Sequence, residues 1–221
     1  MTIKHAVMVG LCCLVATIGC QAPRRGTPPV AVQAGVDLLN PVSESDNDFE
    51  QRMAWFNEAR YGMFIHWGAY SILAGEWQGK TVPFYAEWIQ QRAKIPKEDY
   101  RKVAAQFAPD KFDADAWIRT ARDAGMKYFV ITTKHHDGFC LWDSAYTEYD
   151  IKDHAGVTFD PLAELSRACK KYGVRFGTYY SILEWYPSIE GHDPEAKERY
   201  VTYMKNQVRE LVEKYDTDIL W

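Results

Sequence analysis

The feature that most constrains the fold is a repeated unit: an amphipathic helix, a short turn and an apolar strand. The helices place apolar residues at three- and four-residue spacing, and two of them start with Asp-Pro, a favourable cap and first turn. The unit occurs three times: helix 113–124 and strand 127–133, helix 160–172 and strand 174–180, helix 193–215 and strand 217–221. An earlier strand is expected at 61–67 and an earlier helix at 84–106. Alternating helices and strands predict a parallel sheet with helical crossovers.

Two arrangements accommodate such a chain: an open doubly wound sheet and a (β/α)₈ barrel. No Gly-x-Gly-x-x-Gly motif follows the first strand, so a dinucleotide fold has no support. Polar and aromatic residues instead gather at the carboxyl end of each strand, where barrel enzymes carry their chemistry. We therefore expect a TIM-type (β/α)₈ barrel of which about the first four β/α units are present, a truncated barrel.

Residues 1–20 have the pattern of an export signal. Lys4 and His5 precede fourteen apolar or small residues, a run too short for a comfortable transmembrane helix. Gly19-Cys20 resembles a bacterial lipoprotein box, although Thr17 stands where Leu is usual, so lipidation of Cys20 and ordinary cleavage nearby both stay open. We expect a periplasmic or outer-surface protein, tethered to the membrane if Cys20 is lipidated.

Residues 21–48 are expected to be a flexible linker, and residues 49–221 the folded domain. Up to Ser45 the linker is rich in proline and glycine and has no aromatic residue, so it has little apolar surface to bury. In contrast, the whole chain is 47% hydrophobic and 14% aromatic, which excludes a mostly disordered protein.

Composition also excludes several classes of partner. The formal charge of −4 leaves no broad basic surface, so we expect no nucleic-acid binding. The five cysteines lie partly in the signal region and form neither a disulfide framework nor a zinc-binding spacing.

The strand ends offer two adjacent histidines, His135 and His136. On a regular strand they would face opposite ways, so both reach one ligand only if the strand ends there, as Gly138 permits. From the residues alone, one packed and one exposed histidine is the simpler interpretation. A metal site would need His66 or Asp137 as a third ligand, and no known metal motif supports it.

A second candidate pair is Glu87 and Trp88, at the start of the expected helix 84–106. From the residues alone, a first-turn glutamate favoured by the helix dipole and a core tryptophan are the better explanation. Glu76-Trp77 and Glu184-Trp185 repeat this pattern without a clear role.

The same residues carry a family resemblance. In order and type, five segments resemble the α-L-fucosidases of glycoside hydrolase family 29, over roughly residues 49–221, and Lys-His-His-Asp-Gly-Phe is the most specific block. They are Phe-Ile-His-Trp-Gly at 64–68, Tyr-Ala-Glu-Trp at 85–88, Thr-Lys-His-His-Asp-Gly-Phe-Cys-Leu-Trp at 133–142, Phe-Gly-Thr-Tyr-Tyr-Ser at 176–181 and Asp-Ile-Leu-Trp at 218–221.

The resemblance implies an enzyme that removes terminal α-linked L-fucose from glycoconjugates with retention, through a covalent fucosyl-enzyme, without cofactor or metal. It implies that the fucose pocket is lined by His66, Glu87, Trp88, His135, His136, Tyr179 and Trp221. Imidazoles and a carboxylate can hold sugar hydroxyls, and indole faces suit the sugar ring and its methyl group.

The resemblance departs at the end of the chain. The family's nucleophile is an aspartate just after the match to Trp221, and its acid/base lies further on, so neither is among these 221 residues. Retaining hydrolysis needs two carboxyl groups about 5–5.5 Å apart, and Glu87, Asp137 and Glu184 match binding or supporting positions. We expect the 221-residue chain to express poorly or aggregate, and to hydrolyse no aryl fucoside.

Two alternatives remain open. The chain could be a non-catalytic fucose-binding remnant, or a metal-dependent barrel hydrolase that uses His66, His135 and His136.

Overall fold

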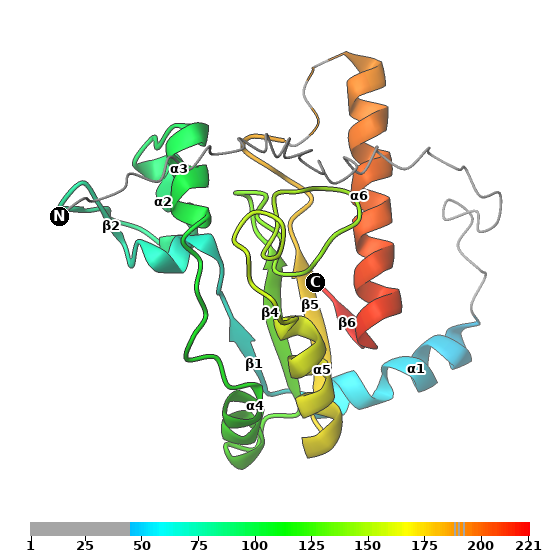
Figure 1. The fold of residues 1–221 in the computed structure, drawn as a ribbon. Coiled ribbons are helices and arrows are strands. Elements are labelled where there is room, and N and C mark those ends of the chain that lie inside the picture. Colours follow the sequence, from blue (N-terminus) through cyan, green and yellow to red (C-terminus); the bar gives the residue numbers. More distant parts are fainter. Residues whose placement is uncertain (1–44, 188, 190, 192) are drawn as a thin grey trace, which may run out of the picture. The chain divides into compact units, whose positions relative to one another are not determined.

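The computed structural model describes residues 45–187, 189, 191 and 193–221. The expected signal, Cys20 and most of the expected linker lie outside the described residues. A four-stranded parallel sheet forms the centre, in the order β1-β4-β5-β6 (Figure 1). The strands are β1 (Gly62–Ile65), β4 (Tyr128–Lys134), β5 (Arg175–Tyr180) and β6 (Ile219–Leu220), so all four expected strands are confirmed. Their order follows the chain without the reversal that marks a doubly wound sheet.

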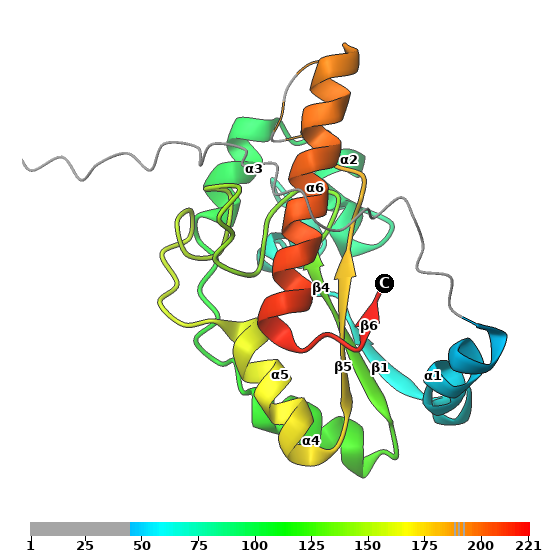
Figure 2. The same ribbon diagram turned by 90° about the vertical axis from the view of Figure 1, so that its right-hand side faces the viewer.

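Three helices cover one face of this sheet (Figure 2): α4 (Ala114–Asp123), α5 (Pro161–Tyr172) and α6 (Pro194–Tyr215). Each begins with an aspartate whose side chain accepts a hydrogen bond from a backbone N–H in the first turn. Asp113 accepts from Ala116 at 2.9 Å, and Asp193 accepts from Ala196 at 2.7 Å. The helix starts predicted from the sequence are therefore confirmed with their capping chemistry.

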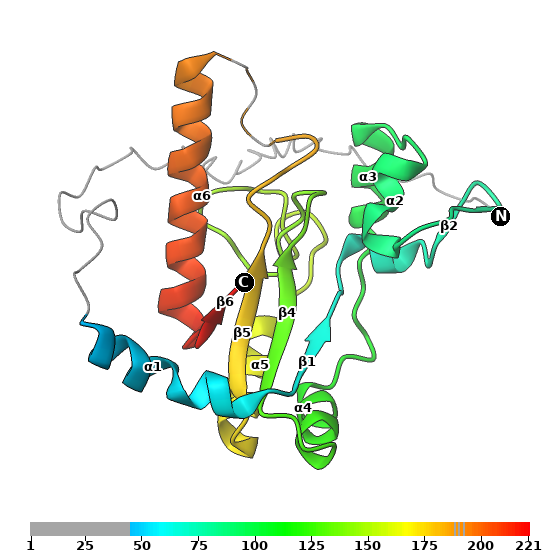
Figure 3. The same ribbon diagram turned by 180° about the vertical axis from the view of Figure 1, so that it is seen from behind.

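Side chains alternate between the two faces of the strands. Met63, Phe129 and Ile131 pack in the hydrophobic core beneath the helices. Figure 3 shows the opposite face of β4 and β5, where the described helix α1 crosses only near the lower ends of the strands. On that face Gly177 lets the strands approach closely, because an added Cβ would lie 2.8 Å from a methyl group of Val130.

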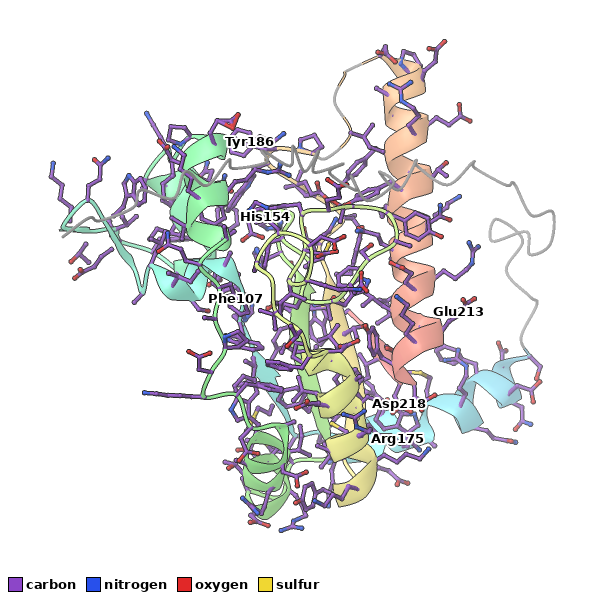
Figure 4. All side chains as sticks on the ribbon, in the orientation of Figure 1. Phe107, His154, Arg175, Tyr186, Glu213 and Asp218 are labelled. Carbon is purple, nitrogen blue, oxygen red and sulfur yellow. The ribbon has the colours of Figure 1, made fainter. Side chains whose placement is uncertain are left out.

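The amino ends of the last two strands are joined by Arg175 and Asp218, which Figure 4 labels beside one another. The guanidinium of Arg175 donates to the Asp218 carboxylate at 2.7 Å, and the same carboxylate accepts from the backbone N–H of Phe176 at 3.2 Å. These bonds help to hold the short strand β6 against β5.

The expected single helix at 84–106 is wrong. The structure has a 3₁₀ turn, η2 (Ala86–Trp88), and two separate helices, α2 (Ile89–Arg92) and α3 (Lys97–Ala104). Pro96 separates the helices, because proline lacks an N–H and keeps the residue before it out of helical geometry. Lys94, with φ of 52°, ends the first helix in a left-handed conformation.

Several elements were not predicted: helix α1 (Asp46–Ala59), a 3₁₀ turn η1 (Ala69–Ile72) and a two-stranded antiparallel hairpin of β2 (Glu76–Trp77) and β3 (Lys80–Thr81). Ser45 caps α1 by accepting from Asp48 N–H at 3.2 Å, so helical structure begins before the expected domain start at Phe49. Among the described residues, no helix is both long and apolar enough to span a membrane.

Candidate active site

Three predicted site residues meet at the carboxyl end of the sheet. His66 follows β1, His135 follows β4 and Tyr179 lies near the end of β5. The ring centroids of His66 and His135 are 5.6 Å apart, and those of His66 and Tyr179 are 6.2 Å apart. The His135 and Tyr179 rings stack at 5.4 Å with an angle of 16° between their planes. Parallel strands thus bring residues more than a hundred positions apart into one cluster.

His136 joins the same cluster. Its ring centroid is 4.3 Å from that of His135, 5.3 Å from that of Trp88 and 5.3 Å from that of Trp185. The two histidines can both face the site because β4 ends at Lys134 and the register with β5 shifts just before it. The expectation that the strand ends at the histidine pair is therefore confirmed.

Glu87 lies beside the histidines. The ligand atoms of His66, Glu87 and His135 all lie within 4.8 Å of one another, close enough to share a sugar hydroxyl or a metal ion. This grouping differs from the histidine triad proposed above as a metal alternative. The Nδ1 atom of His136 shares a hydrogen bond with Ser181 Oγ at 2.7 Å instead.

Asp137 is not a ligand in this cluster. Its carboxylate accepts a hydrogen bond from the hydroxyl of Tyr100 at 2.8 Å and one from the backbone N–H of Phe139 at 3.2 Å. Burial raises the pKa of Asp137 to about 6, and the bond from Tyr100 partly opposes this rise. Asp137 thus supports the loop that follows the two histidines.

Phe64 lies between Trp221 and the cluster and contacts both. The sequence analysis did not include Phe64 among the site residues. The Phe64 ring meets Trp221 edge-on at 5.4 Å, lies 5.1 Å from His66 and is 6.0 Å from Tyr179. Phe64 precedes His66 by two positions, so strand alternation places it on the same face. These rings give the polar cluster one apolar side.

Burial favours the neutral form of two of the histidines, His135 and His136. Burial, followed by the nearby His136 and His66, lowers the pKa of His135 to about 3. Burial also lowers the pKa of His136, although its bond to the Leu183 carbonyl and the charge of Glu87 oppose this. Neutral imidazole both donates and accepts, which matches hydroxyl groups. The Nδ1 atom of His135 is buried and has no hydrogen-bond partner among the described residues.

Trp185 is the second residue that the sequence analysis left without a role. Its ring lies 5.4 Å from Trp88, so the two indoles flank His136. Its backbone N–H donates to the carbonyl of His136 at 2.9 Å, which joins the loop after β5 to the loop after β4. The Glu-Trp pattern at 184–185 singles out this residue in the sequence. It does not predict the contact with Trp88 and His136, because these residues are far away along the chain.

The carboxyl end of the parallel sheet thus gathers imidazole, phenol and indole groups and one carboxylate, which can hold a polar ligand by hydrogen bonds and ring contacts. The chain belongs to the alpha-L-fucosidase family, which it matches over residues 34–221.

Relatives of this chain are named as alpha-L-fucosidases. It is 33% identical to tissue alpha-L-fucosidase of Bos taurus over 180 residues, 76% of this chain and 38% of that protein. It is 33% identical to plasma alpha-L-fucosidase of Homo sapiens over 195 residues, 83% of this chain and 41% of that protein. The chain thus spans about two fifths of the length of these relatives.

Solved structures of alpha-L-fucosidases are also similar to this chain. A GH29 alpha-L-fucosidase from Bacteroides thetaiotaomicron superposes with a TM-score of 0.69 and 39% identity, over 74% of this chain and 38% of that one. Another structure from that organism contains a trapped covalent intermediate formed with 2-fluoro-fucosyl fluoride; it has a TM-score of 0.69 and 40% identity, over 75% of this chain and 39% of that one.

Proposed function

We propose that this chain forms the L-fucose-binding part of an exported α-L-fucosidase with a complete (β/α)₈ catalytic barrel. The observation that carries the proposal is the convergence of His66, Glu87 and His135 within 4.8 Å, bordered by Tyr179. The enzyme removes terminal α-linked L-fucose from glycoconjugates with retention. The covalent intermediate trapped in the Bacteroides relative supports this mechanism.

In this proposal polar side chains bind the sugar hydroxyls, and aromatic side chains contact the sugar ring and its methyl group. The imidazoles of His66, His135 and His136 exchange hydrogen bonds with the sugar hydroxyls, and Glu87 accepts the strongest bond because it is charged. Trp88 and Trp221 cover the ring and the C6 methyl group, and Phe64 and Tyr179 extend the apolar side. In this proposal no cofactor or metal takes part.

The reacting carboxylates are proposed to lie outside these 221 residues, with the nucleophilic aspartate just after Trp221. Asp137 and Glu184 do not replace them, because the first is bound by Tyr100 and the second pairs with the buried Lys134. Glu87 is proposed to bind the sugar. We therefore expect the 221-residue chain to hydrolyse no aryl fucoside, while the full-length protein that carries it does.

The experiment compares hydrolysis of an aryl α-L-fucoside by the full-length protein and by its Glu87→Gln variant. A hydrogen bond to a charged group contributes about 1.5–3 kcal/mol, so kcat/KM should fall by about 10- to 100-fold. Glu213→Gln, a change in a surface residue of α6 labelled in Figure 4, should leave kcat/KM unchanged. A full-length protein that binds L-fucose without hydrolysis would instead indicate a non-catalytic fucose-binding remnant.

A metal-dependent hydrolase is the second candidate, because the three ligand atoms of His66, Glu87 and His135 could hold an ion. Full activity after dialysis against a strong chelator removes this candidate. Loss of activity that added Zn²⁺ or Mn²⁺ restores would favour it over the metal-free mechanism.

Export and lipidation remain proposals for residues 1–20. Mass spectrometry of the mature amino terminus checks them: a diacylglyceryl group on Cys20 is the result expected for a lipoprotein. A free Cys20 thiol would contradict the lipid tether.

A further inference from the structure

Two neighbouring aromatic side chains, Phe84 and Tyr85, are exposed beside the candidate site. Phe84 is 55% exposed and Tyr85 is 66% exposed, and their ring centroids are 4.7 Å apart. Both rings therefore offer area to a ligand while contacting one another. Exposed apolar surface that is contiguous, rather than scattered, is typical of a binding surface.

The backbone holds Phe84 in an unfavourable conformation. Its φ is 107°, a region that glycine adopts freely and that bulky residues avoid. Such strain persists where the surroundings impose it, and it concentrates at binding sites. The guanidinium of Arg92 lies 4.2 Å from the centroid of the Phe84 ring and supports it in this position.

These rings are continuous with the proposed fucose site. The Phe84 ring meets Trp88 edge-on at 5.7 Å, and Trp88 meets His136 at 5.3 Å. The same short turn also positions the glutamate of the site, because the Tyr85 carbonyl accepts from Trp88 N–H at 3.0 Å, with Glu87 between them. A ligand held at His136 would therefore extend over Trp88 toward Phe84 and Tyr85.

We propose that Phe84 and Tyr85 form a platform for the sugar residue to which the fucose is attached. Aromatic faces stack against the C–H surface of a pyranose ring, and the tyrosine hydroxyl can also bond to its hydroxyls. The platform would thus favour fucosylated oligosaccharides over fucosides with a small leaving group. This inference rests on the proposed function, since it assigns the neighbour of a bound fucose.

Saturation-transfer NMR on the full-length protein tests the platform. The probe is a fucosyl disaccharide with a sulfur-linked glycosidic bond, which resists hydrolysis. Saturation should reach protons of the fucose and of the second sugar in the wild type. Tyr85→Ala and Phe84→Gly should lose it on the second sugar only, and glycine tolerates the φ of this position.

Dissociation constants of the disaccharide and of methyl α-L-fucoside test the same platform. Tyr85→Ala should weaken disaccharide binding by about three- to tenfold, and binding of methyl α-L-fucoside by less than twofold. Tyr61→Ala, at a tyrosine that is 53% exposed before β1, is the matched control and should change neither. Saturation of the fucose alone in the wild type overturns the platform and leaves the proposed function intact. Saturation of neither sugar overturns both.

Discussion

Lys134 and Glu184 form an ion pair in which both side chains are 0% exposed. The ammonium of Lys134 also donates to the hydroxyl of Tyr180 at 2.9 Å. Lys134 directly precedes the two site histidines, and Glu184 directly precedes Trp185. The pair therefore joins the loop after β4 to the loop after β5, next in sequence to the histidines that are proposed to bind the sugar.

Removing one partner of this pair should be strongly destabilising. Lys134→Met leaves the Glu184 carboxylate buried without its cation, which costs about 3–5 kcal/mol of unfolding free energy. Lys134→Met combined with Glu184→Leu should recover part of that loss, because it removes both charges. Urea unfolding of the three proteins measures the difference.

An exposed ion pair serves as the control. Lys102 and Asp99 are joined at 2.8 Å, but their side chains are 74% and 45% exposed. Because this pair is exposed, Lys102→Met should cost far less unfolding free energy than Lys134→Met. Equal losses for Lys134→Met and Lys102→Met would show that the buried pair does not hold the two loops.

The low pKa of His135 predicts a stability that depends on pH. Its pKa is about 3 in the folded protein, chiefly because of burial, and about 6.5 in an unfolded chain. The unfolded state therefore binds the proton first, and the free energy of unfolding falls as the pH drops from 6.5 toward 3, by at most about 1.4 kcal/mol per pH unit. His135→Gln should show a shallower fall between pH 6.5 and 4.5 in urea unfolding. Parallel curves for the two proteins would contradict the neutral, buried imidazole.

Much of the fold could be predicted from the sequence, because the signals are local. The aspartate caps and the apolar spacing fix where α4, α5 and α6 start and which face they bury. The expected helix 84–106 ran across Pro96, although proline disfavours helical geometry in the residue before it. The hairpin of β2 and β3 is too short to have a pattern, since each strand has two residues.

The site residues could be predicted only where they belong to a sequence motif that resembles the family. His66, Glu87 and His135 were expected together, and the structure brings them together. Phe64 and Trp185 were missed because their contacts join strands and loops that are distant in sequence. Which carboxylate binds and which supports also depends on tertiary partners, as the bond from Tyr100 to Asp137 shows.

Tyr100→Phe should change the titration of Asp137. The folded pKa of Asp137 is about 6, above its ordinary value, so the folded state binds the proton more tightly and stability falls as the pH rises through 4 to 6. The Tyr100 hydroxyl stabilises the charged carboxylate, so its loss raises the pKa of Asp137 further. The cost should be about 1.5–3 kcal/mol at pH 7.5 and smaller at pH 4.

Asp137→Asn is the control for that experiment, because it removes the titrating group and should flatten this part of the pH dependence. The measurement is the free energy of unfolding in urea at pH 4 and pH 7.5. A loss on Tyr100→Phe that is equal at both pH values would mean that the Tyr100 hydroxyl does not favour the charged form of the Asp137 carboxyl.

Phe64→Ala should reduce the preference for a sugar with a methyl group at C6. The edge-on contact of Phe64 with Trp221 at 5.4 Å gives the site an apolar side that suits a methyl group. L-galactose differs from L-fucose by a hydroxyl on that carbon, which loses its hydration against these rings. The wild-type full-length protein should bind L-fucose more tightly than L-galactose, and Phe64→Ala should bring the two dissociation constants within about threefold by weakening L-fucose. Phe49→Ala, at a ring that is 50% exposed on α1, should keep the wild-type ratio. An unchanged ratio in Phe64→Ala would place the methyl group away from Phe64.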